Sequence, residues 1–133
     1  MKKIILLSLI SFGLILHSQS SFAQELDSAK VLSVKKFEKK AKNSKKNQVI
    51  DIRTPDETKE GHIEDALFID FLAEDFLEEI GDLDKNKTYL IYCRSGKRTQ
   101  RAGVEMKKAG FKKVFLMEGG FTAWEKEGKP VKK

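Results

Sequence analysis

The chain's single cysteine, Cys93, stands in the segment YLIYCRSGKRTQRAG, directly after an apolar run and before a group of basic residues. From Cys93 to Arg98 the sequence reads as a short loop that contains Gly96 and leads into a helix. Such a loop can turn the unpaired N–H groups of the helix start, and the positive end of its dipole, toward the sulfur. Arg94, Lys97 and Arg98 add positive charge and form an expected basic rim, although they need not all point inward. These surroundings favour the thiolate, so the pattern predicts a nucleophilic cysteine.

A free cysteine at the end of a strand can also be a small buried hydrophobic residue. That alternative accounts for Cys93 but leaves the basic, glycine-containing loop after it unexplained, and we favour the reactive interpretation. No metal or other cofactor is expected, because Cys93 and the distant His62 do not make a ligand set.

The order of elements places this loop in a fold class. Helices are expected over residues 34–43, from residue 74 to near Gly81, over residues 98–109 and from Gly119 onward. Strands are expected over residues 48–52, 66–71, 88–93 and 113–117, with Thr54-Pro55 as the stop after the first. Strands that alternate with helices predict an α/β domain, a parallel sheet covered on both faces. Ligands bind such sheets beyond the carboxyl ends of the strands. Cys93 stands at one of these ends.

The N-terminal 23 residues have the three parts of a secretory signal, namely Lys2 and Lys3, an apolar stretch over residues 4–16, and the small-x-small sequence Ser21-Phe22-Ala23. The apolar stretch is shorter than the ~20 residues that span a bilayer, so we favour cleavage over retention as an anchor. We predict one mature domain over residues 24–133, with no membrane association after cleavage. The signal indicates export from a bacterial cell, to the periplasm or beyond it.

Charge and cysteine count narrow the classes of partner. The predicted mature chain carries 24 basic and 20 acidic residues, a net charge of +4, which is too low to indicate a nucleic-acid binder. The lysine-rich run KKFEKKAKNSKKN is interpreted as a solvated helix face and a loop. Small anions remain candidate ligands. An unpaired cysteine in an exported protein indicates an intermolecular partner or a reactive thiol.

Three segments together carry a family resemblance: VIDIRTPDETKEGHIEDALFI, YLIYCRSGKR and VFLMEGGFTAWEKEGKPV. Over about residues 29–131 the chain resembles a single-domain rhodanese, a sulfurtransferase domain. The resemblance implies a central five-stranded parallel sheet and a Cys93 that accepts a sulfane sulfur to become a persulfide. It also implies an active-site loop whose amides cradle that sulfur, made of Arg94, Ser95, Gly96, Lys97 and Arg98.

The implied substrates are a small anionic donor, thiosulfate or a persulfide, and an acceptor that is cyanide or a thiol. A second hypothesis is a sulfur carrier or sensor that serves one protein partner with slow turnover. A catalytically silent domain is disfavoured by the intact loop. Phosphatase and arsenate-reductase chemistry ranks lower, because related phosphatases need five residues between cysteine and arginine, and here Arg98 comes one position too early.

Several residues near the predicted site have a structural alternative. Asp51 and Arg53 end a strand and are candidate supporting residues, although a structural ion pair is the favoured interpretation. Glu57 is a candidate partner for Arg53. His62 is interpreted as a structural hydrogen-bonding residue, and Gly119-Gly120 as a tight loop close to the cysteine.

Overall fold

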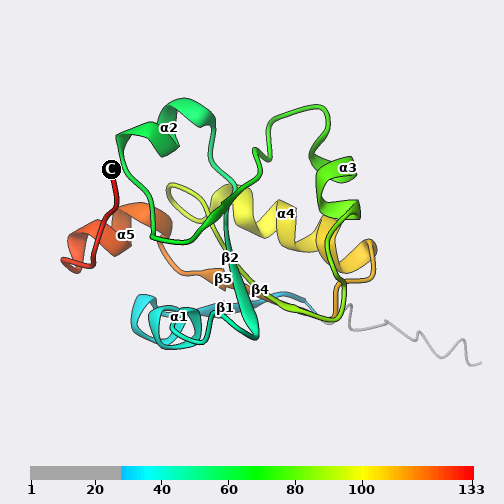
Figure 1. The fold of residues 1–133 in the computed structure, drawn as a ribbon, viewed down its shortest axis with the longest axis horizontal. Helices are drawn as coiled ribbons and strands as arrows, with labels where there is room; N and C mark the ends of the chain where they lie inside the picture. Colours follow the sequence, from blue (N-terminus) through cyan, green and yellow to red (C-terminus); the bar gives the residue numbers. More distant parts are fainter. Residues whose placement is uncertain (1–27) are drawn as a thin grey trace, which may run out of the picture.

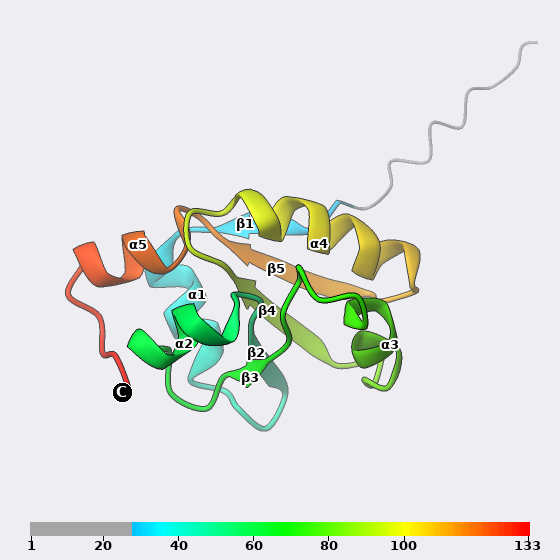
Figure 2. The same ribbon diagram turned by 90° about the horizontal axis from the view of Figure 1, so that it is seen from above.

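Five parallel strands form one sheet, drawn in Figure 1, and Figure 2 shows their order, β1-β5-β4-β2-β3. The computed structural model describes residues 28–133, and the predicted signal peptide, residues 1–23, lies outside the described residues. The strands are β1 (Lys30–Leu32), β2 (Asn47–Asp51), β3 (Leu67–Phe68), β4 (Thr88–Tyr92) and β5 (Lys113–Met117). The helices are α1 (Val34–Ala41), α2 (Pro55–Glu60), α3 (Phe76–Gly81), α4 (Lys97–Lys108) and α5 (Gly120–Lys126).

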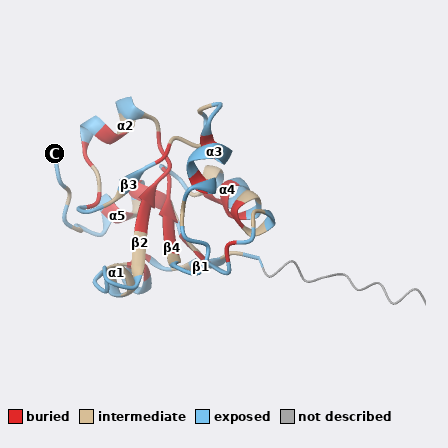
Figure 3. Cartoon of the chain, turned by 45° about the vertical axis from the view of Figure 1, so that its right-hand side comes forward, coloured by how far each residue is buried: buried red, intermediate tan, exposed pale blue. Residues whose placement is uncertain are grey.

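Helices cover both faces of the sheet, which confirms the predicted α/β fold. On one face, α3 and α4 pack against a core cluster through residues such as Phe76 and Met106. On the other, α1 and α5 contribute Phe37 and Trp124 to a second cluster. Figure 1 shows the strands between α1 below and α4 above. Figure 3 shows the buried residues concentrated in β2 and β4 and on the inward sides of the helices.

The near-continuous apolar run of β4 supplies both clusters. Successive side chains of a strand point to opposite faces. Tyr89 and Ile91 accordingly join the cluster under α3 and α4, whereas Leu90 and Tyr92 join the one under α1 and α5. Cys93 continues this alternation and belongs to the α3 and α4 side. The strand thus delivers the cysteine to its carboxyl end, facing the start of α4.

Two elements were not predicted, β1 and α2. The Thr54-Pro55 pair, interpreted as the end of a strand, begins helix α2. Thr54 Oγ1 accepts a hydrogen bond from the Glu57 backbone N–H, and the Glu57 carboxylate accepts one from the Thr54 N–H, which is a capping box. Pro55 at the first helical position supports this start. Strand β1 has three residues, too few for a periodic signal.

The strand predicted over residues 66–71 is shorter in the structure, because it consists of Leu67–Phe68. The Ile69 N–H still donates to the Asp51 carbonyl, but the Asp70 carboxylate accepts the Leu72 N–H and turns the chain away. Helix α3 ends at Gly81 as predicted, but it begins at Phe76, two residues later than expected. Within residues 28–133, no helix combines the length and the apolar character that crossing a bilayer requires.

Candidate active site

The Cys93 sulfur lies inside the loop that connects β4 to α4. The Gly96 N–H donates to the Cys93 Sγ at 3.2 Å. Gly96 has a φ of 97°, a left-handed conformation that suits glycine, and this turns its N–H back toward the sulfur. Helix α4 begins at the next residue, Lys97, so the sulfur sits at the positive end of a 12-residue helix. Cys93 is 1% exposed.

Thr99 is a site residue that the sequence reasoning did not select. Its Oγ1 lies 4.0 Å from the Cys93 Sγ and donates to the Gly96 carbonyl at 2.8 Å. Thr99 is buried, in the first turn of α4. It therefore closes the loop from the helix side and keeps a hydroxyl near the sulfur. Thr99 is six residues from Cys93 in the sequence, and no local pattern marked it as a site residue. Its place beside the sulfur depends on how the loop folds.

A second loop holds the backbone at the cysteine, as the Gly119-Gly120 pair predicted. The Phe121 N–H donates to the Cys93 carbonyl at 2.7 Å, and the Thr122 N–H to the Arg94 carbonyl at 3.0 Å. Gly120 adopts a φ of 60° directly against these two carbonyls. The start of α5 is thus pinned to the start of the active-site loop.

Arg98 is held by Glu57 of α2. Its Nη1 and Nη2 donate to Glu57 Oε2 and Oε1, each at 2.7 Å, a bidentate pair. Both side chains are about one fifth exposed. These hydrogen bonds from Arg98, assisted by those from Thr54, lower the pKa of Glu57 to about 2 against the opposing effect of burial. The same pairing raises the pKa of Arg98.

This pair makes an acid-dependent contribution to stability. Because the pKa of Glu57 is lower in the folded protein than its ordinary 4.5, the contribution is present above about pH 4.5 and is lost as the pH falls through about 2. We expect Glu57→Gln to lower the free energy of unfolding at pH 6 by on the order of 1 kcal/mol, since solvent screens a partly exposed pair. The difference from wild type should shrink between pH 4.5 and pH 2.

Urea unfolding followed by circular dichroism over this pH range measures the effect. Glu60→Gln is the matched control, because Glu60 is exposed on the same helix. A Glu57→Gln difference that stays constant with pH would contradict the role given to the carboxylate.

Asp51 and Arg53 form a buried ion pair with each other, which corrects the expectation that Glu57 would be the partner of Arg53. Arg53 Nε donates to Asp51 Oδ1 at 2.9 Å, and Arg53 Nη2 to Asp51 Oδ2 at 2.7 Å and to the Gly61 carbonyl at 2.7 Å. Burial opposes the positive charge, but hydrogen bonds and attraction from Asp51 leave the pKa of Arg53 raised. Burial, with the charge of Asp51, also raises the pKa of Tyr92, whose hydroxyl donates to Asp51.

The ion pair reaches the active-site loop through aromatic contacts. The Arg53 guanidinium carbon lies 4.0 Å from the centroid of the Phe121 ring and 5.5 Å from that of Tyr92. Tyr92 directly precedes the cysteine, and Phe121 supplies the N–H that holds the Cys93 carbonyl. The pair therefore supports the backbone at the site through Tyr92 and Phe121.

Two hollows flank the loop. One, of about 240 Å³, is lined by residues 95–97, 99 and 100 together with Val31 and residues 116–119. The other, of about 480 Å³, is lined by Arg53, Arg94 and Phe121 and by four carboxylates of α2 and α5, namely Asp56, Glu57, Glu60 and Glu125. Arg94 and Lys97 are exposed at this end of the sheet. The larger hollow therefore has more negative than positive lining side chains, and Lys97 and Glu118 are the charged residues that line the smaller one.

The family model for the rhodanese-like domain matches residues 33–127, the part of the chain that contains the sheet from β2 to β5 and the cysteine loop. The chain belongs to the rhodanese-like domain family.

Similar proteins agree with this membership. YtwF of Bacillus subtilis is 37% identical over 101 residues, which cover 76% of this chain and 95% of that protein. A protein of Allochromatium vinosum named sulfurtransferase is 34% identical over 83 residues, 62% of this chain and 76% of its own. The crystal structure of a rhodanese-like domain protein from Staphylococcus aureus has a TM-score of 0.65 at 28% identity and covers 78% of this chain and 99% of its own. Relatives of this rhodanese-like domain are named as sulfurtransferases.

The predicted site residues of this rhodanese-like domain lie close to one another in the fold, but they make different contacts. Cys93 and Gly96 meet at the sulfur, whereas Arg94, Ser95 and Lys97 are on or near the surface. Arg98 belongs to the predicted loop, yet its guanidinium binds the carboxylate of Glu57. The basic rim expected around the sulfur thus rests mainly on Arg94 and Lys97.

Proposed function

We propose that this rhodanese-like domain moves a sulfane sulfur from a small anionic donor such as thiosulfate to cyanide or a thiol, through a persulfide on Cys93. The observation that carries the proposal is the contact between the Gly96 N–H and the Cys93 Sγ at the N-terminus of α4. This arrangement stabilises negative charge on the sulfur, both as a thiolate and as a persulfide. The naming of relatives as sulfurtransferases supports it.

The first half-reaction loads the cysteine. The Cys93 thiolate attacks the outer sulfur of thiosulfate, a bond forms between Sγ and that sulfur, and the sulfur–sulfur bond of thiosulfate breaks. Sulfite leaves with the electron pair, and the exposed Arg94 and Lys97 are placed to attract both anions. The Gly96 N–H and the start of α4 offset the charge of the persulfide that remains.

The second half-reaction restores the thiolate. Cyanide or an acceptor thiolate attacks the outer sulfur of the persulfide, and the bond to Sγ breaks with its electron pair returning to Cys93. The product is thiocyanate or a new persulfide, and no oxidant or reductant enters the cycle. This is covalent catalysis in two steps, with ping-pong kinetics as its signature.

Two features favour sulfur over phosphate as the transferred group. Cys93 is 1% exposed, so there is little open space at its sulfur. A single added sulfur atom therefore suits the site better than a tetrahedral phosphoryl group. The arginine of the loop, Arg98, gives the terminal nitrogens of its guanidinium to Glu57 instead of turning them into the loop. A phosphoryl group would therefore lack a bidentate arginine donor here.

The test is the intact mass of the purified protein before and after thiosulfate, beside Cys93→Ser as the matched control. The expected result is a gain of one sulfur atom in the wild type, reversed by cyanide, and no gain in the variant, because the chain has one cysteine. Absence of the gain in a protein whose thiol still reacts with an alkylating reagent would refute the persulfide. Rapid production of thiocyanate would distinguish an enzyme from a carrier, which would release its sulfur only to a specific protein.

A further inference from the structure

A row of lysines forms where the strands begin, at the end of the sheet opposite Cys93. β2, β4 and β5 start in register, because Asn47 pairs with Thr88 and Thr88 with Lys113. Adjacent strands lie about 4.8 Å apart, so residues at their starts are neighbours. Three pairs of exposed lysines stand at these starts, which we call the basic edge: Lys45 and Lys46, Lys85 and Lys87, Lys112 and Lys113.

Helix α1 extends the basic edge. Its last turn carries Lys39 and Lys40, and Asn47 Nδ2 donates to the Lys40 carbonyl at 2.7 Å, which ties the end of α1 to the start of β2. A hollow of about 420 Å³ at this junction is lined by three lysines and two asparagines together with Leu32: Lys36, Lys39, Lys40, Asn43 and Asn47. Positive charge therefore continues from the strand starts onto the helix.

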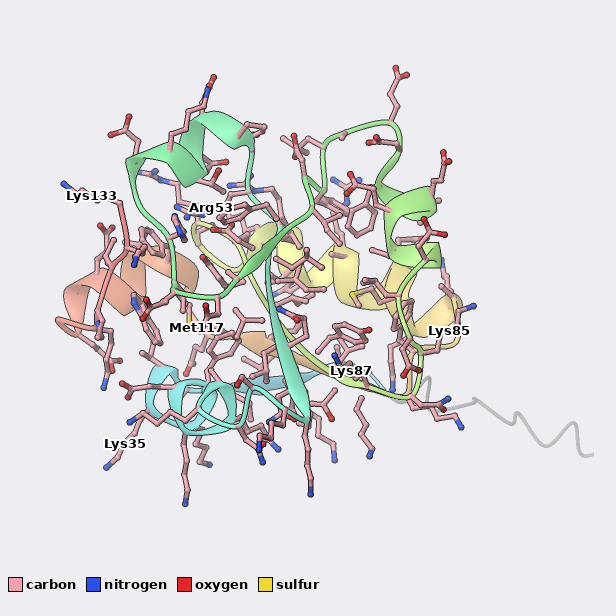
Figure 4. The ribbon with its side chains drawn as sticks, in the orientation of Figure 1. Lys35, Arg53, Lys85, Lys87, Met117 and Lys133 are labelled. Atoms are coloured by element: carbon pink, nitrogen blue, oxygen red, sulfur yellow. The ribbon has the colours of Figure 1, made fainter. Side chains whose placement is uncertain are left out.

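The acidic side chains gather at the other end. Figure 4 shows nitrogen-tipped side chains along the border that includes the labelled Lys35 and Lys87, whereas oxygen-tipped ones lie along the opposite border at α2 and α3. Asp82 and Asp84 are the exposed carboxylates close to the basic edge in sequence, and that of Asp84 accepts the Asn86 N–H at 2.9 Å within the turn before β4. The molecule is thus electrically polarised along its strands, with the candidate active site at the less basic end.

The N-terminal segment joins the protein at this same edge. Ser28, the first described residue, lines a hollow with Lys30, Lys107, Lys112 and Lys113. The 27 residues that precede Ser28 include the apolar stretch over residues 4–16. A segment whose composition suits insertion into a bilayer is therefore connected to the protein beside its lysines, whether it is later cleaved or not.

In place of the expectation of no membrane association after cleavage, we propose that the basic edge docks the protein on an anionic phospholipid surface, with the Cys93 end turned toward the solvent. Clusters of four to eight basic side chains bind anionic headgroups, and the attraction decays within a Debye length of about 10 Å. The six lysines of the basic edge stand at the starts of three adjacent strands that are in register, so a flat surface can contact them at the same time. A bilayer fits better than a nucleic acid, because the net charge of the whole chain is only +6 and the opposite end repels a polyanion that wraps around the protein.

The experiment uses residues 24–133, so that the apolar stretch cannot insert. A domain of this extent folds by itself. The match to the Staphylococcus aureus protein covers 78% of this chain and 99% of that protein, so that protein consists of little more than this domain. Co-sedimentation with vesicles of phosphatidylglycerol and phosphatidylcholine is compared with vesicles of phosphatidylcholine alone, at roughly 0.05 M salt. Binding to the anionic vesicles only, reversed at about 0.5 M salt, is the expected result.

Two variants locate the surface. One changes Lys45, Lys46, Lys85 and Lys87 to glutamine. The matched control changes four exposed lysines away from the edge: Lys59, Lys126, Lys132 and Lys133. Both lose four positive charges, so a difference between them reports position and not net charge.

We expect the edge variant to partition onto anionic vesicles at least roughly tenfold more weakly than the wild type, and the control to change by less than about threefold. Equal losses in the two variants would overturn the docking surface. So would equal binding to both vesicle types, or stronger binding to duplex DNA than to anionic vesicles at the same salt. Sulfur loading measured by intact mass should be unchanged in both variants, because the edge lies away from Cys93.

Discussion

Asp51→Ala is expected to lower the free energy of unfolding by about 3–5 kcal/mol, because it leaves the Arg53 charge buried without its partner. Asp51 is fully buried and Arg53 is 2% exposed. The variant also removes the acceptor of the Tyr92 hydroxyl, beneath the active-site loop. Urea unfolding at pH 7 followed by circular dichroism measures the loss.

Two controls separate the causes of this loss. Asp56→Ala breaks a surface pair with Lys59 at 3.7 Å and should change stability by less than about 1 kcal/mol. The double variant Asp51→Leu with Arg53→Met removes both charges and should recover much of the stability, since a buried pair replaced by apolar side chains is often neutral. An Asp51→Ala protein as stable as the wild type would show that the pair does not hold this part of the fold.

Gly120→Ala is expected to destabilise the protein by about 3 kcal/mol and to slow sulfur loading of Cys93. A Cβ at Gly120 would lie 2.5 Å from the carbonyl oxygens of Cys93 and Arg94. The φ of 60° adds strain for any residue with a side chain. The carbonyls cannot withdraw without losing their hydrogen bonds from Phe121 and Thr122, so the change displaces the active-site loop itself.

Gly128→Ala is the matched control for this prediction. Gly128 has a similar φ of 67°, but a Cβ there would meet nothing within 4 Å. It should cost about 1 kcal/mol from backbone strain alone and leave sulfur loading unchanged. Urea unfolding and the rate of mass gain with thiosulfate give both quantities. Equal effects at the two glycines would mean that the close approach at Gly120 has no consequence for the site.

Local sequence patterns were sufficient for the α/β fold and for the position of the cysteine. The apolar run of β4 is typical of a strand buried on both faces, and Gly96 followed by basic residues predicts a loop that feeds a helix. Helix α2 was missed because Thr54-Pro55 was interpreted as a stop, although the Glu57 three residues after Thr54 completes a capping box. The short β1 escaped prediction because three residues show no periodicity, and β3 was predicted too long because residues 66–71 form one mainly apolar run.

Taken by itself, the amino-acid sequence determined the parallel α/β order, a lone cysteine at the end of a buried strand, and a glycine loop that leads into a helix. Hydrophobic periodicity and turn residues are local, so neighbouring residues suffice to express them. Only the tertiary structure decided that Arg98 binds Glu57, 41 residues away, that Gly120 presses on the Cys93 carbonyl, and that lysines from three strand starts form one edge. These contacts depend on strand order and register, which set the neighbours of segments far apart in the chain.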